Sequence, residues 1–291
     1  MKVNRPHVSV QTREGYYAGE TRAAGLKPTV VSPAAAAGID GVLPRTDIPL
    51  RLSVAPFAAP GRKESTVAIV VHAQQSSSTG QSGPIKVLAA AFDRNGRSID
   101  AQEQTVAITS RAPAGGTTPY EVLSRLALAP GRYEIRVALD AGLGQRASVY
   151  TYVDVPDFAR QPLSLSGLLL AVSPTVPVAP ADAFSRITSV IPTARREMAR
   201  TDHATVFLRV YQEANATVGP ATITARITDT ADRVVFNDVT QLAVDRFTAD
   251  HGADYLLDLP AGRLASGEYL LTIEAAQGER TARRGMRFTM R

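Results

Sequence analysis

The chain has 291 residues, with 32 Lys and Arg, 27 Asp and Glu, four His, no Cys and no Trp. At about 100–200 residues per domain, this length predicts two domains. The apolar fraction of 44% excludes a disordered or fibrous chain. Without Cys, the chain can hold no disulfide framework, no thiol nucleophile and no Cys-ligated metal site.

The net charge of +5 makes the placement of the basic residues important. They are spread along the whole chain and mixed with nearly as many acidic residues. Proteins that bind nucleic acid gather Lys and Arg on one face or in runs. The densest cluster is Arg280, Arg283, Arg284 and Arg287, of which Arg283 and Arg287 share one strand face. We therefore expect no nucleic-acid partner.

Targeting and membrane signals are both missing from the sequence as given. No apolar run approaches the ~20 residues of a transmembrane helix, so we expect no membrane span. The residues after Met1 and Lys2 lack the apolar core of a secretion signal. If the protein is exported, we expect its signal to lie outside this sequence.

Residues 1–47 predict one strand followed by a linker. Val3, Val8 and Val10 supply the apolar positions of the strand, which closes at Gly15–Tyr17. Residues 18–47 then lose all periodicity and are rich in Pro, Gly and Ala, which is typical of a linker.

Residues 48–158 predict a first β-sandwich. Apolar and polar residues alternate with a period of two, which is typical of half-buried strands. Asn95-Gly96 is a strong hairpin signal. Seven short strands with frequent turns favour an immunoglobulin-like or fibronectin III-like sandwich. The strands are expected at 48–54, 66–73, 85–92, 105–109, 122–128, 133–139 and 149–155.

Residues 159–291 repeat this plan, which predicts a tandem duplication and an all-β fold of two sandwiches. A first strand near Leu163–Leu169 precedes a Pro-rich ordered loop that reaches Pro192. Pro-rich connections are stiff, so we expect the two sandwiches to hold a fixed relation. Further strands are expected at 205–211, 222–228, 257–259, 269–273 and 284–290.

Tyr133 and Tyr269 each follow a Pro or Gly turn and begin a strand. Sandwiches place a tyrosine corner at this point, with the ring in the core and the hydroxyl on a backbone carbonyl upstream. We expect both tyrosines, together with Phe288, to point inward.

The residues suggest no catalytic, cofactor-binding or metal site. His7, His72, His203 and His251 lack metal-ligand spacing, and His72 is expected to end a core strand. The sequence contains neither a nucleophile elbow nor a phosphate loop.

Two acidic loops are candidates for Ca²⁺. One contains Asp93, Asn95 and Asp100, and the other contains Asp229 and Asp232, with Asp238 as a further ligand. Ca²⁺ needs six to eight oxygen ligands, more than either loop offers. We therefore interpret these side chains as turn stabilisers.

The segment Lys2–Tyr17 resembles the last strand of the von Willebrand factor A-type domains of Acidobacteria-type bacterial proteins. The shared pattern is Val-x-Val-x-x-Arg-x-Gly-Tyr-Tyr, which ends here at Tyr17. The second half is similar to the C-terminal region of the same proteins, from Pro192–Asp202 through a Leu-x-x-Gly-x-Tyr corner. The resemblance implies a C-terminal portion that follows a missing A-type domain. The Asp-x-Ser-x-Ser metal motif of that domain is absent, so no metal site is implied.

These features favour a non-enzymatic module that acts in protein–protein interaction, adhesion or spacing. We expect it to be extracellular, periplasmic or in the cell envelope, with a protein partner and no cofactor. Sandwich end loops would supply the contacts, and the candidates are Gln74–Pro84, Arg111–Pro119 and Asn215–Pro220.

Two other functions are considered. A carbohydrate-binding module would need exposed aromatic rings, for which Tyr16, Tyr17, Tyr150 and Tyr152 are available. Exposure of both Tyr150 and Tyr152 would favour this function, and burial of both would exclude it. A peptidase fragment would need a His within hydrogen-bond reach of both a Ser and a carboxylate.

Overall fold

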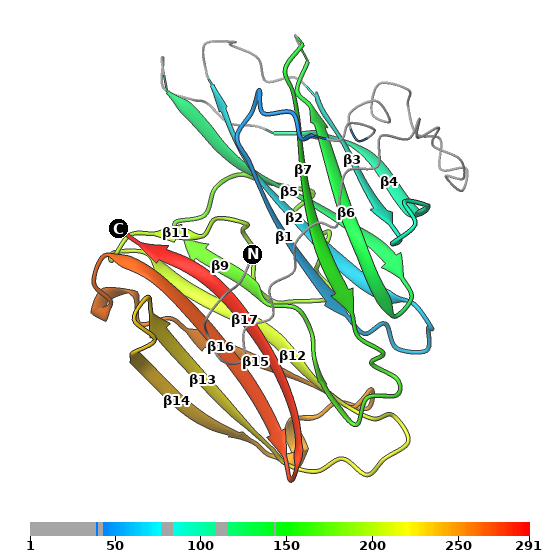
Figure 1. The fold of residues 1–291 in the computed structure, drawn as a ribbon, viewed down its shortest axis with the longest axis vertical. Coiled ribbons are helices and arrows are strands. Elements are labelled where there is room, and N and C mark those ends of the chain that lie inside the picture. Colours follow the sequence, from blue (N-terminus) through cyan, green and yellow to red (C-terminus); the bar gives the residue numbers. More distant parts are fainter. Residues whose placement is uncertain (1–38, 40–42, 77–83, 109–115, 143) are drawn as a thin grey trace.

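The computed structural model describes residues 39, 43–76, 84–108, 116–142 and 144–291. The chain is all-β and forms two sandwiches that follow one another along the long axis of the molecule (Figure 1). The predicted N-terminal strand and most of the linker lie outside the described residues.

The first sandwich contains the seven expected strands. One sheet has the order β1-β2-β5 and gains the short strand β10 (Val178–Ala179) at its edge, and the facing sheet has the order β4-β3-β6-β7. Their inward-facing side chains form one apolar core. The strands are β1 (Leu50–Phe57), β2 (Ser65–Ser76), β3 (Pro84–Phe92), β4 (Ser98–Ala107), β5 (Thr117–Leu128), β6 (Gly131–Asp140) and β7 (Arg146–Val155).

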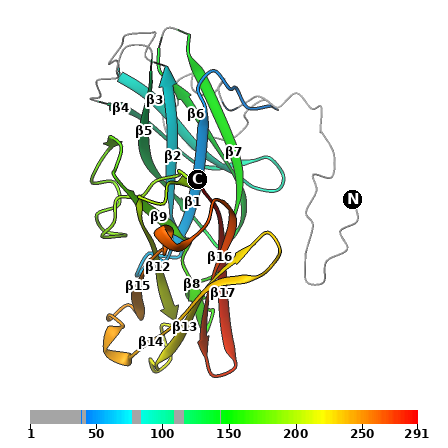
Figure 2. The ribbon, with the colours of Figure 1, turned by 90° about the vertical axis from the view of Figure 1, so that its left-hand side faces the viewer.

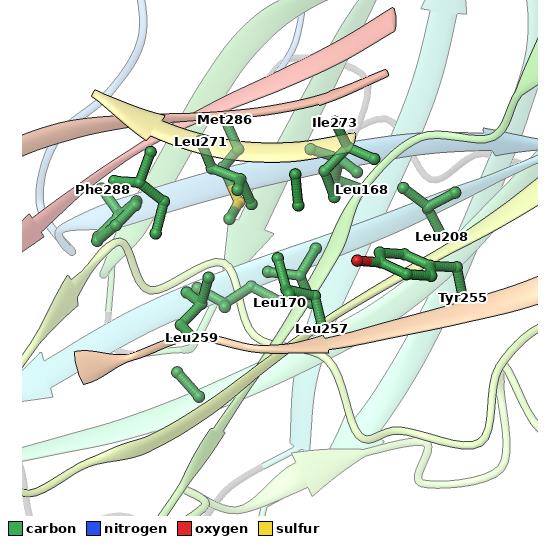
Figure 3. Close-up of a cluster of buried hydrophobic side chains, with 14 of the residues drawn as sticks. Leu168, Leu170, Leu208, Tyr255, Leu257, Leu259, Leu271, Ile273, Met286 and Phe288 are labelled. Atoms are coloured by element: carbon green, nitrogen blue, oxygen red, sulfur yellow. The ribbon is translucent and has the colours of Figure 1, made fainter. Parts of the chain in front are cut away.

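The second sandwich has the same order of strands along the chain. One sheet joins β15, β12 and the pair β8 and β9, and the other has the order β11-β17-β16-β13-β14. Figure 3 shows side chains of both sheets meeting in the core between them. The strands are β8 (Leu163–Leu165), β9 (Leu169–Ser173), β11 (Glu197–Met198), β12 (His203–Gln212), β13 (Ala221–Asp229), β14 (Val234–Leu242), β15 (Gly252–Asp258), β16 (Gly267–Gln277) and β17 (Arg280–Met290). Duplication of an ancestral unit stays a prediction.

Both tyrosine corners are confirmed. The Tyr133 hydroxyl donates to the Ala129 carbonyl at 3.1 Å, and the Tyr269 hydroxyl donates to the Ala265 carbonyl at 2.9 Å. Both rings are buried, and Tyr269 stacks on the buried ring of Phe288. The two corners fix the start of β6 and of β16 against the turns that precede them.

Strand β14 is a correction to the sequence analysis. The sequence places Asp238 with the acidic turn of Asp229 and Asp232, but Asp238 lies inside β14, which pairs antiparallel with β13. Polar residues occur on both faces of this strand, while Val239 is exposed. The strand therefore lacks the period-two hydrophobic pattern by which a half-buried strand is recognised.

The end of the linker packs on the first sandwich. Ile39 is 2% exposed and contacts Leu88, Ala90 and Ala138 on the outer face of the β4-β3-β6-β7 sheet. Arg136 donates to the Ile39 carbonyl at 2.9 Å. Residues 43–47 then run beside β7, where Ser148 donates its amide to the Arg45 carbonyl. Figure 2 shows this segment entering the first sandwich.

Candidate functional site

The junction of the two sandwiches combines a buried apolar layer with a network of buried polar groups. The outer face of β1, β2 and β5 is apolar and is covered by the second sandwich, including the loop between its strands β9 and β11. The rings of Phe57 and Phe207 stack across the junction with centroids 6.1 Å apart. The buried residues that share this layer are Ala55, Phe57, Ala68, Val70, Leu123, Leu169, Phe184, Ala194 and Phe207.

Gly167 brings the backbones of the two sandwiches into direct contact. The first strand of the second sandwich is interrupted between β8 and β9, and there the Gly167 amide donates to the Pro56 carbonyl at 2.8 Å. A Cβ atom on Gly167 would lie 2.4 Å from the Cα atom of Ala55. Since real Cβ atoms do not approach backbone so closely, only glycine fits here without movement of one sandwich.

The segment between β8 and β9 is fixed by hydrogen bonds from Arg284 of β17. Its guanidinium donates to the carbonyls of Ser166 and Leu165 at 3.0 and 2.9 Å. Burial lowers the pKa of Arg284, and the nearby Asp154 opposes this effect. Arg284, from the densest basic cluster, is therefore used inside the fold, while Arg283 and Arg287 are exposed as strand parity predicts.

A buried polar network lies beside this apolar layer. His72 of β2 and Glu121 of β5 are cross-strand partners, are 3% and 2% exposed, and place Nδ1 2.8 Å from Oε1. The Thr193 hydroxyl donates to the same carboxylate, and the Ala194 amide donates to Oε2 at 3.3 Å. The Glu121 carboxylate thus fixes Thr193 and Ala194, in the loop before β11, to the first sandwich. His72 lies inside β2 and does not end it, because β2 stays paired with β5 as far as Ser76.

Arg196 extends the network toward β1. Its guanidinium donates to the Ser53 hydroxyl at 2.7 Å and to the carbonyls of Thr193 and Arg195. Burial lowers the pKa of Arg196 to about 10, although the negative charge of Glu121 acts in the opposite direction. Thr193 therefore contacts both charged groups, with its hydroxyl on Glu121 and its carbonyl on Arg196.

The order of groups in this network does not suit nucleophilic catalysis. A triad needs an imidazole between the hydroxyl and the carboxylate, so that the imidazole can take the hydroxyl proton. Here Thr193 bonds to Glu121 and not to His72. The adjoining void of about 10 Å³ has room for roughly one water molecule.

The other histidines are placed in ordinary surface contacts. His203 Nε2 lies 3.7 Å from Asp258, whose carboxylate also accepts the Thr205 hydroxyl at 2.6 Å, and His203 and Asp258 are largely exposed. His251 bonds to the Glu213 carbonyl. His7 lies outside the described residues.

Asp93 and Asp229 stabilise turns as expected, whereas Asp100 does not, because it lies inside β4 and accepts the Ala127 amide of β5. Asp93 accepts the amides of Asn95 and Arg97, both at 2.9 Å, and so closes the turn between β3 and β4. Asp229 accepts the Ala231 and Arg233 amides in the same way, and its bonds with Arg233 lower the pKa of Asp229. Within the described ranges, no three His, Asp or Glu side chains gather as metal ligands would.

The two tyrosines of β7, Tyr150 and Tyr152, differ in their exposure. Tyr152 is 52% exposed, whereas Tyr150 is half-buried. The guanidinium of Arg132 lies 5.3 Å from the Tyr152 ring centroid, and that of Arg136 lies 5.1 Å from the Tyr150 centroid. Arginine therefore stacks on both rings, and only Tyr152 offers substantial free ring surface.

A second pocket, of about 130 Å³, lies where the β1–β2 loop meets the second sandwich. Tyr211 forms part of its wall and accepts the Ala58 amide at 3.2 Å, and burial raises the pKa of Tyr211. Sites for small molecules usually measure about 300–1,000 Å³, so this pocket is small for an organic ligand.

Most of the first two predicted contact loops, residues 77–83 and 111–115, lies outside the described residues. The third loop is held by Gln212, whose amide donates to the Gly219 carbonyl and accepts its N–H. In the part of the chain that the structure describes, no helix is long and apolar enough to span a membrane.

No protein-family model and no curated protein matches this sequence. Solved structures that are similar include a putative beta-galactosidase from Bacteroides fragilis, at 9% identity and a TM-score of 0.29 over 76% of this chain and 32% of that one. A glycosyl hydrolase family 2 member from Bacteroides cellulosilyticus has 13% identity and a TM-score of 0.31, with 80% and 30% covered. Dimeric latent PorU from Porphyromonas gingivalis has 14% identity and a TM-score of 0.33, with 87% and 21% covered. The chain spans about a third or less of each, and the fold assignment rests on its own strand order and hydrogen bonds.

Proposed function

We propose that this chain is a non-catalytic, two-sandwich module that acts as a stiff spacer and presents protein-binding surfaces within a larger exported or envelope protein. The resemblance of Lys2–Tyr17 to the end of an A-type domain supports a position directly after such a domain. The reading frame upstream of Met1 tests that placement, because it must then encode an A-type domain and a secretion signal.

The observation that carries the proposal is the junction itself. A spacer transmits position only when its parts hold one relative orientation, and interfaces between independent domains are usually small and polar. Here the junction combines a fully buried apolar layer with the buried carboxylate of Glu121 and the backbone contact of Gly167. The hydrogen bonds of Glu121 and Gly167 would be lost if the second sandwich rotated against the first.

Spin-label distance measurements test this stiffness directly, because the chain contains no Cys that could be labelled by accident. Labels at the exposed positions Thr105 and Arg283 report the distance between sandwiches. Labels at Thr105 and Asp154 report a distance within the first sandwich and serve as the control. We expect equally narrow distance distributions for both pairs. A broad or multi-peaked distribution for the first pair alone would refute the proposal.

Carbohydrate binding is kept as a second candidate because the Tyr152 ring is exposed. Its test is affinity electrophoresis on bacterial cell-wall polysaccharides with the wild-type chain and Tyr152→Ala. A retardation that disappears in this variant would favour carbohydrate binding, and equal mobility of both proteins on every polysaccharide would exclude it. The exposed Val244→Ala is the matched control.

A further inference from the structure

Strand β14 presents an open sheet edge with exposed apolar side chains. In the described part of the chain, β14 pairs with β13 along one edge, and its other edge faces no strand. Val234, Val235 and Val239 are 54%, 44% and 59% exposed. Such edges offer unpaired backbone donors and acceptors to another strand, and proteins normally block them with charges or short lengths.

The equivalent edge strand of the first sandwich, β4, differs from β14 by carrying a charged residue at the middle of its outer face. Inward-facing side chains of β4 bond to the backbone of β5: Asp100 accepts the Ala127 amide at 2.8 Å, and Gln104 donates to the Leu123 carbonyl at 2.7 Å. On the outer face, Glu103 places a charge at the middle of the strand. In both edge strands the register shifts at one residue near the start, which has no cross-strand partner: Ile99 in β4 and Val235 in β14. Counted from this irregularity, Glu103 and Val239 each lie four residues further along and occupy equivalent positions.

The regular part of β14 has a sequence that sets compatible residues opposite one another when it pairs antiparallel with itself. The segment Phe236–Leu242 reads Phe-Asn-Asp-Val-Thr-Gln-Leu, with Val239 at its centre. An antiparallel copy centred on Val239 would set Val239 opposite Val239, amide side chains opposite each other, Asp238 opposite Thr240, and Phe236 opposite Leu242. Thr240 already donates to Asp238 within the strand at 3.0 Å, so the two side chains are compatible.

Other registers are less favourable for a second copy. Moving the centre to Asp238 would set two carboxylates directly opposite one another, which is destabilising in a sheet. A register centred on Asn237 would set Val235 opposite Val239, and the β-bulge at Val235 would disturb the hydrogen bonds between the two strands there. Only the Val239-centred register keeps every pair within the regular segment and free of like charges.

We propose that β14 is a homotypic interface, at which a second copy of this chain adds its own β14 antiparallel about a twofold axis through Val239. The contact would join two five-stranded sheets into one continuous sheet, with each surface patch facing itself as twofold symmetry requires. It pairs two spacer modules side by side and leaves the junction between the sandwiches untouched.

Sedimentation velocity of the full chain over a concentration series tests the interface. The monomer has a mass of 30.9 kDa, and we expect the average mass to rise toward the dimer value with concentration. Val239→Glu places two carboxylates at the twofold axis and should weaken the dimer by about tenfold or more. Leu256→Glu is the control, because Leu256 is 48% exposed on β15 and outside the proposed contact. A wild-type chain that stays monomeric, or a dimer that survives Val239→Glu, would overturn the proposal.

The register has its own test in oxidative cross-linking. Opposed residues in an antiparallel pair have Cα atoms about 4.5–5.5 Å apart, within the range of a disulfide. Val239→Cys should therefore form a disulfide-linked dimer under mild oxidation. Gln241→Cys and Leu256→Cys should not, because Gln241 faces Asn237 and Leu256 lies on another strand. Cross-linking through position 241 but not 239 would refute this register.

Discussion

Replacing Gly167 by alanine is the sharpest test of the junction between the sandwiches. The added methyl group would lie 2.4 Å from the Ala55 Cα atom, 2.6 Å from its Cβ atom and 2.9 Å from Pro56 Cδ. These atoms belong to the backbone, a short side chain and a ring, so none can turn aside. The backbone of Gly167 is outside the left-handed region, so the substitution adds a steric clash without conformational strain.

The expected cost follows from two losses. Displacing Gly167 breaks its 2.8 Å hydrogen bond to Pro56, which contributes about 1 kcal/mol. Forcing a methyl group into a filled interface costs about 1–3 kcal/mol. We therefore expect the free energy of unfolding to fall by about 2–4 kcal/mol, which most domains with a total stability of about 5–15 kcal/mol survive.

Urea denaturation and small-angle X-ray scattering measure the two consequences. Gly285→Ala is the matched control, because its new Cβ atom would lie 3.5 Å from the Leu271 carbonyl oxygen, in ordinary contact. Both substitutions restrict the unfolded chain equally, so their difference isolates the clash. We expect Gly167→Ala alone to lower stability and to increase the radius of gyration. Equal stabilities and scattering profiles for the two variants would refute the reasoning.

Three further predictions concern buried polar groups and are checked by urea denaturation. Glu121→Gln should destabilise by about 3 kcal/mol or more, because it leaves the buried donors of the junction without their carboxylate, whereas the exposed Glu268→Gln should change little. Tyr133→Phe should cost about 1 kcal/mol through loss of the bond to Ala129, and no measurable loss would contradict the corner. Burial raises the pKa of Tyr120 to about 12, above its ordinary 10.0. The folded state therefore holds this phenol proton more tightly than the unfolded state, so the free energy of unfolding is unaffected below pH 10 and falls as the pH rises from 10 through 12. Tyr120→Phe should leave stability at pH 7 unchanged and lessen the alkaline loss by about 2–3 kcal/mol; an unaltered alkaline profile would contradict this.

The strands that could be predicted from sequence are those with one buried face. β6 alternates Tyr133, Ile135 and Val137 with charged residues, and its inner residues are buried as expected. The tyrosine corners were equally predictable, because a turn, a Tyr and a strand follow one another directly in the chain. In such elements the local sequence and the final burial agree, so the pattern is sufficient.

The edge strands were harder to predict because their inner faces are polar. The sequence gives only 105–109 as a weak strand, yet β4 begins at Ser98. Asp100, Gln102 and Gln104 point inward and bond to β5, so the hydrophobic alternation disappears where the strand closes the side of the sandwich. β14 was missed for the same reason, with Asp238 and Thr240 on its inner face.

The junction could not be predicted from one sequence, although one signal points to it. The run Val67–Val71 is apolar at every position, and a strand of this kind is buried on both faces. That run indicates that something covers the outer face of β2, but it does not identify what. The covering residues come from β9, β12 and the loop before β11, about a hundred residues further along the chain.

The buried polar network has a different physical role from the apolar layer beside it. A small apolar side chain such as Ala68 can slide against a neighbouring surface with little change in buried area. The Glu121 carboxylate cannot, because any shift that separates it from Thr193 and Ala194 leaves a buried charge without donors. Apolar burial therefore accounts for the strength of the junction, and the carboxylate accounts for its single orientation. A spacer needs both, since strength without a fixed orientation would hold the sandwiches together and still let them rotate.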